Sequence, residues 1–146
     1  METLHGPRFL VVDDDRKDMD QTLQAIRTHC SSYEARIAEG AWEGLDYLFA
    51  QGRFHERQRH PLPDVVLLAA NMAHIDGVQV LKRIAETDYL RKIPVALLCE
   101  NEDEKRRALR EGVPAATLVM KPISTDNLRD VLRQRAMPPI QQRQVA

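Results

Sequence analysis

The chain has 146 residues, of which 43% are hydrophobic and 5% aromatic, enough for one domain with an aliphatic core. Because 21 Lys and Arg residues nearly cancel 22 Asp and Glu residues, the net charge of −1 excludes a polybasic binder of nucleic acid or membrane surfaces. Two cysteines, Cys30 and Cys99, are too few for a disulfide scaffold. No apolar run suits a signal peptide or a membrane span, so we expect a cytoplasmic protein that binds no membrane.

Five strand–helix pairs are predicted along the chain. Apolar runs without polar alternation indicate buried strands, and apolar residues at helical spacing indicate helices. The polar stretch 52–63 predicts a loop, and we expect an N-terminal lead at 1–7, one domain at 8–136 and a C-terminal tail at 137–146. In chain order, the predicted strands are at 9–12, 34–38, 65–68, 95–98 and 115–120. The helices that follow them are at 15–29, at 41–50, at the segment marked by Val78, Leu81, Ile84 and Ala85, at 102–111, and after a cap at Ser124 or Thr125. In the helix at 102–111 we expect Ala108 and Leu109 to face inward, with Gly112 after its end.

This order predicts an α/β fold with a five-stranded, doubly wound parallel sheet covered by helices on both faces. In such sheets the site lies at the carboxyl ends of the strands. Those ends carry Asp13-Asp14-Asp15, Ala69-Ala70-Asn71, Cys99-Glu100 and Lys121-Pro122. Carboxylates and a lysine that meet at one edge of a sheet are typical of a magnesium and phosphoryl site.

The motifs at these strand ends resemble those of the receiver domain of bacterial two-component response regulators. The resemblance covers residues 8–135 and depends on FLVVDDD, PDVVLLAANMAHIDG, IPVALLC and VMKP, which occur in this order. The segment GLDYLFAQGRFHERQRHPLPDVVLL is most similar to the small stand-alone regulators associated with bacterial and cyanobacterial phytochromes. The resemblance implies the (βα)5 flavodoxin-like receiver fold.

The resemblance also implies roles for individual residues. In the family, an Asp at the end of the third strand attacks a phosphohistidine, with magnesium held by that Asp and an acidic pair. Asp13 and Asp14 match the acidic pair, with Asp14 as the direct magnesium ligand, and Asn71 matches the residue whose backbone carbonyl meets the metal. Lys121 matches the lysine that contacts the phosphoryl oxygens, and Asp76-Gly77 matches the turn that opens the third helix.

Three positions depart from the family's pattern. Ala69 occupies the phosphoacceptor position, Cys99 occupies the Ser/Thr switch position, and Ala73 replaces the usual proline. The loop before the fourth helix is also predicted to be short and the segment after it long. Alanine has no nucleophile, and an acid on another strand cannot supply in-line attack. With one carboxylate fewer, we expect weak magnesium binding at most.

Structural roles compete with these assignments. Asp13–Asp15 could form an N-terminal cap for the first helix, and Lys121 could serve only to pair with the acids. Cys99 could be a small buried hydrophobic residue without redox chemistry. In the loop, His55, Glu56 and His60 are interpreted as solvated residues rather than metal ligands, and Arg53, Arg57 and Arg59 form a small basic patch.

The sequence therefore predicts a degenerate receiver, or pseudo-receiver, that is not an enzyme and acts through phosphorylation-independent protein–protein interaction. The expected partners are a second copy of the chain, which would bind through the fourth helix, fifth strand, fifth helix and residues 137–146, and a sensor histidine kinase or phytochrome. Nucleic acid is not an expected partner. Two alternatives stay open: an active phosphotransfer regulator with another acceptor, and a variant of an active regulator whose acceptor was removed.

Overall fold

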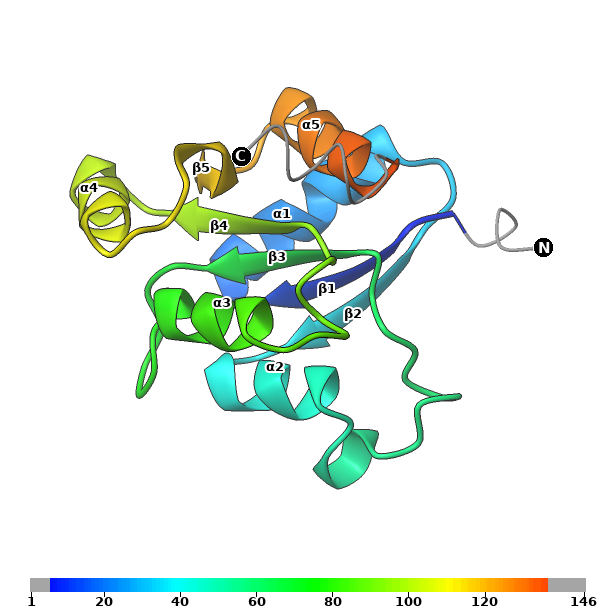
Figure 1. Cartoon of the computed structure of the whole chain (residues 1–146). Coiled ribbons are helices and arrows are strands. Elements are labelled where there is room, and N and C mark those ends of the chain that lie inside the picture. The colour runs from blue at the N-terminus through cyan, green and yellow to red at the C-terminus, as the bar shows by residue number, and fades with distance from the viewer. Residues whose placement is uncertain (1–5, 137–146) are drawn as a thin grey trace.

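The computed structural model describes residues 6–136 as one five-stranded parallel sheet with the strand order β2-β1-β3-β4-β5 (Figure 1). This is the doubly wound α/β fold that the sequence predicts. The strands are β1 (Arg8–Val12), β2 (Glu34–Ala38), β3 (Val65–Ala69), β4 (Val95–Cys99) and β5 (Leu118–Met120). The helices are α1 (Arg16–His29), α2 (Ala41–Leu48), α3 (Gly77–Ala85), α4 (Glu102–Arg110) and α5 (Thr125–Ala136), with 3-10 turns η2 (Gly52–Phe54) and η3 (Ala115–Thr117).

Helices cover both faces of the sheet, so the central strands are buried on both sides, whereas the edge strand β2 is partly exposed. Helices α1 and α5 lie on one face, and α2 and α3 lie on the other (Figure 1). All five residues of β3 and of β4 are buried, because side chains of alternate residues in a strand enter opposite cores. This explains why the strands read as continuous apolar runs.

Helices α1, α3, α4 and α5 begin at residues whose side chains cap them, whereas α2 begins after Gly40 without a side-chain cap. The side-chain oxygens of Asp15, Asp76, Asn101 and Ser124 each accept a hydrogen bond from the backbone N–H three residues later, at 2.9–3.1 Å. Such caps satisfy amides that have no partner inside the helix. Of the predicted caps, Asp15 from the Asp13–Asp15 cluster caps α1 and Ser124, rather than Thr125, caps α5. Gly112 follows α4 with a positive φ of 93°, as expected of a glycine after a helix end.

Three local predictions are wrong. Helix α2 ends at Leu48, not at residue 50. The predicted strand at 115–120 begins only at Leu118, because η3 forms a tight turn in which Thr117 N–H donates to the Pro114 carbonyl at 2.9 Å. Leu109 is 41% exposed rather than inward, since α4 lies beyond the edge of the helical layer and buries only Ala108 (Figure 1).

The predicted basic patch in the loop at 52–63 is not a free cationic surface. Arg57 turns inward and donates to the backbone carbonyls of Tyr47, Leu48 and His60 at 2.8–3.1 Å. Arg53 and Arg59 each pair with a glutamate, at 3.0 and 3.8 Å. The loop is therefore tied to α2, with two of its three arginines neutralised locally.

Within residues 6–136, no helix has both the length and the apolar character needed to cross a membrane. The predicted tail at 137–146 and most of the predicted lead lie outside the described residues.

Candidate functional site

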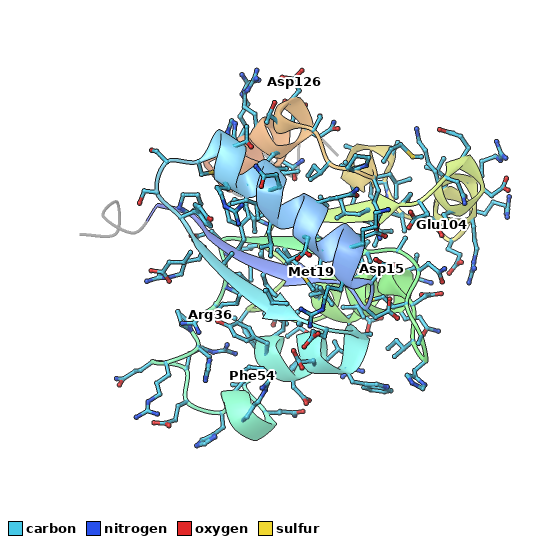
Figure 2. All side chains as sticks on the ribbon, turned by 180° about the vertical axis from the view of Figure 1, so that it is seen from behind. Asp15, Met19, Arg36, Phe54, Glu104 and Asp126 are labelled. Carbon is cyan, nitrogen blue, oxygen red and sulfur yellow. The ribbon has the colours of Figure 1, made fainter. Side chains whose placement is uncertain are left out.

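The carboxyl ends of β1, β3, β4 and β5 meet at one edge of the sheet. Leu68 of β3 pairs with Val12 of β1, and Ala69 pairs with Leu98 of β4. The residues that follow these strands therefore lie together, beside the start of α1 and of α4, where Figure 2 labels Asp15 and Glu104. This arrangement brings Asp13 and Lys121 into contact, as the sequence predicts.

The Lys121 ammonium is bound by three carboxylates from three segments of the chain. Its Nζ lies 2.9 Å from Asp18 Oδ2, 3.0 Å from Asp13 Oδ2 and 3.4 Å from Glu100 Oε2. The side chain of Lys121 is only 8% exposed. Sequence reasoning placed Asp13 and Glu100 at this edge but missed Asp18, which is in the first turn of α1. Its position three residues after the Asp15 cap was the available signal.

The pKa values at this site follow from burial and from the shared ammonium. Burial raises the pKa of Asp13, against the lowering effects of the Asp15 amide and Lys121. The hydrogen bond from Lys121 lowers the pKa of Asp18, whereas burial raises that of Glu100. Burial alone would lower the pKa of Lys121, but its contacts with Asp18 and Asp13 raise it above its usual range. Lys121 is therefore a permanently charged centre of this cluster.

Asp14 makes a different contact from Asp13. Its Oδ2 accepts a hydrogen bond from the backbone N–H of Ala73 at 2.8 Å. Ala73 lies between β3 and α3, so this bond joins the end of β1 to the β3–α3 loop. Asp13 instead accepts from the Asp15 N–H at 3.0 Å through Oδ1, which orders the turn into α1.

The positions of the predicted phosphoacceptor and switch residues are closed to solvent. Ala69 and Cys99 are both fully buried in the core. A Cβ on Gly77 would lie 2.1 Å from the Ala69 carbonyl oxygen, so α3 starts directly against the end of β3 and requires glycine there. Burial, and then the charge of Glu104, raises the pKa of the Cys99 thiol, which keeps this cysteine protonated and poorly reactive.

The residues at this edge do not fit the magnesium ion that the receiver fold implies. Asp13 Oδ2 faces the Lys121 ammonium, Asp14 Oδ2 faces the Ala73 N–H, and Ala69 has no side-chain oxygen. Asn71 is exposed beside them. Across residues 6–136, no three His, Cys, Asp or Glu side chains are grouped to hold a metal ion. The Lys121 ammonium and the Ala73 backbone N–H thus each hold a carboxylate oxygen that a cation would need.

The fold and the strand-end residues define the class of protein to which this chain belongs. The model of the response regulator receiver domain family matches residues 9–133. Since this is most of the chain, the protein is a member of the response regulator receiver domain family.

Individual relatives agree with this assignment. The chain is 35% identical over 92 residues to the "Probable methanogenesis regulatory protein FilR2" of Methanothrix harundinacea and 27% identical over 96 residues to "Response regulator Rcp1" of Synechocystis. These matches cover 62% and 66% of the chain but only 56% and 63% of the two relatives, so less than two thirds of either.

Two solved structures show that this chain is similar to phytochrome-associated regulators. The bacteriophytochrome response regulator AtBRR is 28% identical with a TM-score of 0.78, over 89% of this chain and 92% of that one. The bacteriophytochrome response regulator RtBRR is 26% identical with a TM-score of 0.77, over 90% of this chain and 79% of that one. The predicted similarity to this subgroup of receivers is confirmed.

Proposed function

We propose that this protein is a pseudo-receiver: a receiver domain that acts through protein–protein interaction and carries no phosphoryl group on the usual strand end. The observation that carries the proposal is Ala69, a fully buried methyl group at the end of β3. A methyl group offers no lone pair to attack a phosphohistidine. With no reaction of its own, the protein is not an enzyme under this proposal.

The neighbouring acids give no ready substitute for the missing acceptor. Asp13 lies against Lys121, and Asp14 accepts the Ala73 N–H. Both belong to the end of β1, so an attack from either would need a different line of approach to the phosphorus. Lys121, which would stabilise the phosphoryl oxygens, is already shared by three carboxylates.

Intact-mass spectrometry tests this function directly. The full chain is incubated with acetyl phosphate and magnesium, and its mass is compared with that of an untreated sample. We expect no change in mass. A stoichiometric gain of one phosphoryl group that hydroxylamine removes would overturn the proposal and favour an active regulator with another acceptor.

The proposed partners are a second copy of the chain and a phytochrome or sensor histidine kinase. A mixed-charge surface on α4 supports the contact between copies, because Glu102, Asp103 and Glu104 lie before Arg106, Arg107 and Arg110, and such surfaces suit self-complementary two-fold contacts. The exposed Leu109 adds an apolar group. The similarity to AtBRR and RtBRR, which their titles call bacteriophytochrome response regulators, supports the phytochrome or kinase.

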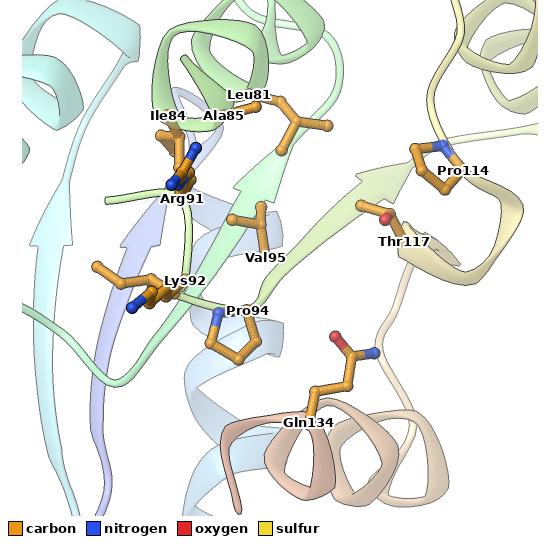
Figure 3. A pocket seen from close by; sticks show the side chains of 11 residues that line it. Leu81, Ile84, Ala85, Arg91, Lys92, Pro94, Val95, Pro114, Thr117 and Gln134 are labelled. Atoms are coloured by element: carbon orange, nitrogen blue, oxygen red, sulfur yellow. The ribbon is translucent and has the colours of Figure 1, made fainter. Parts of the chain in front are cut away.

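A hollow beside α5 extends the proposed contact surface. It measures about 320 Å³ and lies between α3, the segment before β4, η3 and α5 (Figure 3). Leu81, Ile84, Ile93 and Pro94 line it, and Gln134 closes it from the α5 side. Residues 137–146 continue the chain directly after α5 and include Met137 and Ile140. We therefore include this segment in the proposed homodimer interface.

Nucleic acid is left out of the proposed partners. The net charge of the chain is −1, and the loop arginines either turn inward or pair with glutamates. A nucleic-acid surface needs several cations that are free to replace counterions at phosphates.

A further inference from the structure

One departure from the family pattern, Ala73, takes part in a hydrogen bond to a residue that keeps the pattern, Asp14. Ala73 stands where the family has proline, and its backbone N–H donates to Asp14 Oδ2 at 2.8 Å. Proline has no backbone N–H. This bond therefore exists only because residue 73 is not proline, and it uses the carboxylate that matches the direct magnesium ligand.

An N–H group aimed at a carboxylate oxygen competes with a metal ion for that oxygen. The amide hydrogen carries partial positive charge and occupies the lone-pair direction along which a cation would approach. Magnesium loses its water reluctantly and needs several well-placed oxygens. Asp13 gives little help, because this residue is only 2% exposed and its Oδ2 lies 3.0 Å from the Lys121 ammonium.

We propose that the Ala73 backbone N–H has taken the place of the divalent cation at Asp14, so that residue 73 determines whether this edge of the sheet binds metal. The β3–α3 loop closes on Asp14 through this bond. The Ala73 amide donates a hydrogen bond to Asp14 at the place where the family's pattern would put the cation. The inference concerns the same site as the proposed function, but it does not require that function to be correct.

Manganese binding to the full chain tests the proposal. Mn²⁺ is the probe, and electron paramagnetic resonance measures the ion that stays free. Ala73→Pro deletes the N–H, whereas the matched control Ala73→Ser keeps it. We expect Ala73→Pro to bind Mn²⁺ about tenfold more tightly than the unaltered chain, equivalent to about 1.4 kcal/mol, and Ala73→Ser to bind like the unaltered chain. Equal affinities in all three proteins overturn the proposal.

The fluorescence of Trp42 gives a second measurement of Mn²⁺ binding at Asp14. This residue is the only tryptophan in the sequence, is 57% exposed, and lines a hollow of about 280 Å³ together with Asp14, Ala73 and His74. Quenching of Trp42 fluorescence by Mn²⁺ should therefore follow the same affinity order. Tighter binding of Mn²⁺ by Ala73→Pro with no effect on Trp42 would place the ion elsewhere and count against the proposal.

Amide hydrogen exchange tests the bond without relying on a proline variant. The exchange rate of the Ala73 amide is measured by NMR in the full chain, in Asp14→Ala and in the control Asp20→Ala, which removes another acid from the adjoining hollow. We expect Asp14→Ala to speed exchange at Ala73 at least tenfold and Asp20→Ala to leave it unchanged. An unchanged rate in Asp14→Ala overturns the proposal. Because neither experiment measures phosphorylation, failure here is distinct from failure of the pseudo-receiver proposal.

Discussion

Lys121 joins three segments of the chain through one ammonium group. Asp13 follows β1, Asp18 belongs to α1, and Glu100 follows β4, and all three carboxylates lie within 3.4 Å of Nζ. A charge that is 8% exposed must be paired to be tolerated. In the pseudo-receiver account, this lysine serves as a structural clamp across the edge of the sheet.

Asp18→Asn tests the clamp. Because Lys121 lowers the pKa of Asp18, the ion pair stabilises the fold above the unfolded pKa of about 4, and that stabilisation is lost as the pH falls through the lower folded value. We expect Asp18→Asn to reduce the free energy of unfolding by about 1–2 kcal/mol near neutral pH and by less near pH 3. Urea unfolding at both pH values measures this.

Asp20→Asn is the control for the clamp, since Asp20 is an exposed acid on the same helix. Its effect on the free energy of unfolding should be within about 0.5 kcal/mol at both pH values. An Asp18→Asn loss of equal size at neutral and acid pH would show that the charge of Asp18 is not what stabilises the fold.

Ala69→Asp restores the missing carboxylate but not its surroundings. Since Ala69 is fully buried, we expect the free energy of unfolding to fall by about 1–3 kcal/mol. Phosphorylation by acetyl phosphate should be partial at most, because Lys121 is engaged and Asp14 is bound by Ala73. The association state should not respond, because Cys99 lacks the hydroxyl of the switch position.

Intact mass and light scattering measure these two outcomes, and Ala70→Asp at the next position is the control for an added carboxylate. A variant Ala69→Asp that becomes fully phosphorylated and then changes its association state would contradict the account.

At the scale of the secondary-structure elements, the side chain of Arg57 holds the loop between α2 and β3 against α2. Arg57 satisfies three backbone carbonyls that lie on α2, at its end and in the loop. We expect Arg57→Met to lower the free energy of unfolding by about 1–3 kcal/mol, because those acceptors lose their donor, and to speed amide exchange around Tyr47 and Phe54.

Arg59→Met provides the comparison for the loop. Arg59 is an exposed neighbour whose 3.8 Å pair with Glu56 is solvated, and such pairs contribute about 0–1 kcal/mol. Chemical unfolding measures the loss in free energy of unfolding for both variants. Equal losses in the two variants would show that the carbonyl contacts of Arg57 carry no particular weight.

The strands were predictable from the sequence because burial on both faces leaves a continuous apolar run, as in Val65–Ala69. The exposure of Leu109 was not predictable from the sequence, because helical spacing does not show how far α4 lies from the sheet. Asp18 was missed because its partner Lys121 is 103 residues away, and local spacing does not specify such pairs. The replacement of proline by Ala73 was visible in the sequence, but the acceptor of its N–H was not, because Asp14 lies 59 residues away in the chain.

At the scale of the whole molecule, the proposed homodimer gives the protein a means of acting without phosphate. We expect the full chain to be a dimer at micromolar concentrations and a chain that ends at residue 135 to dissociate more readily, because the truncation removes the apolar residues Met137 and Ile140. Light scattering over a range of concentrations measures both proteins. A monomeric full chain throughout that range rejects the dimer, and an unchanged dimer after truncation rejects a role for residues 137–146.

Amide hydrogen exchange of the full chain, with magnesium present throughout and acetyl phosphate added to one of two samples, tests the pseudo-receiver account most directly. It reports both modification of the site and any response of α4, β5 and α5. The account predicts superimposable exchange in the two samples, because Ala69 accepts no phosphoryl group and Lys121 is held in place by Asp13, Asp18 and Glu100. Donor-dependent changes in protection across α4, β5 and α5 would contradict it.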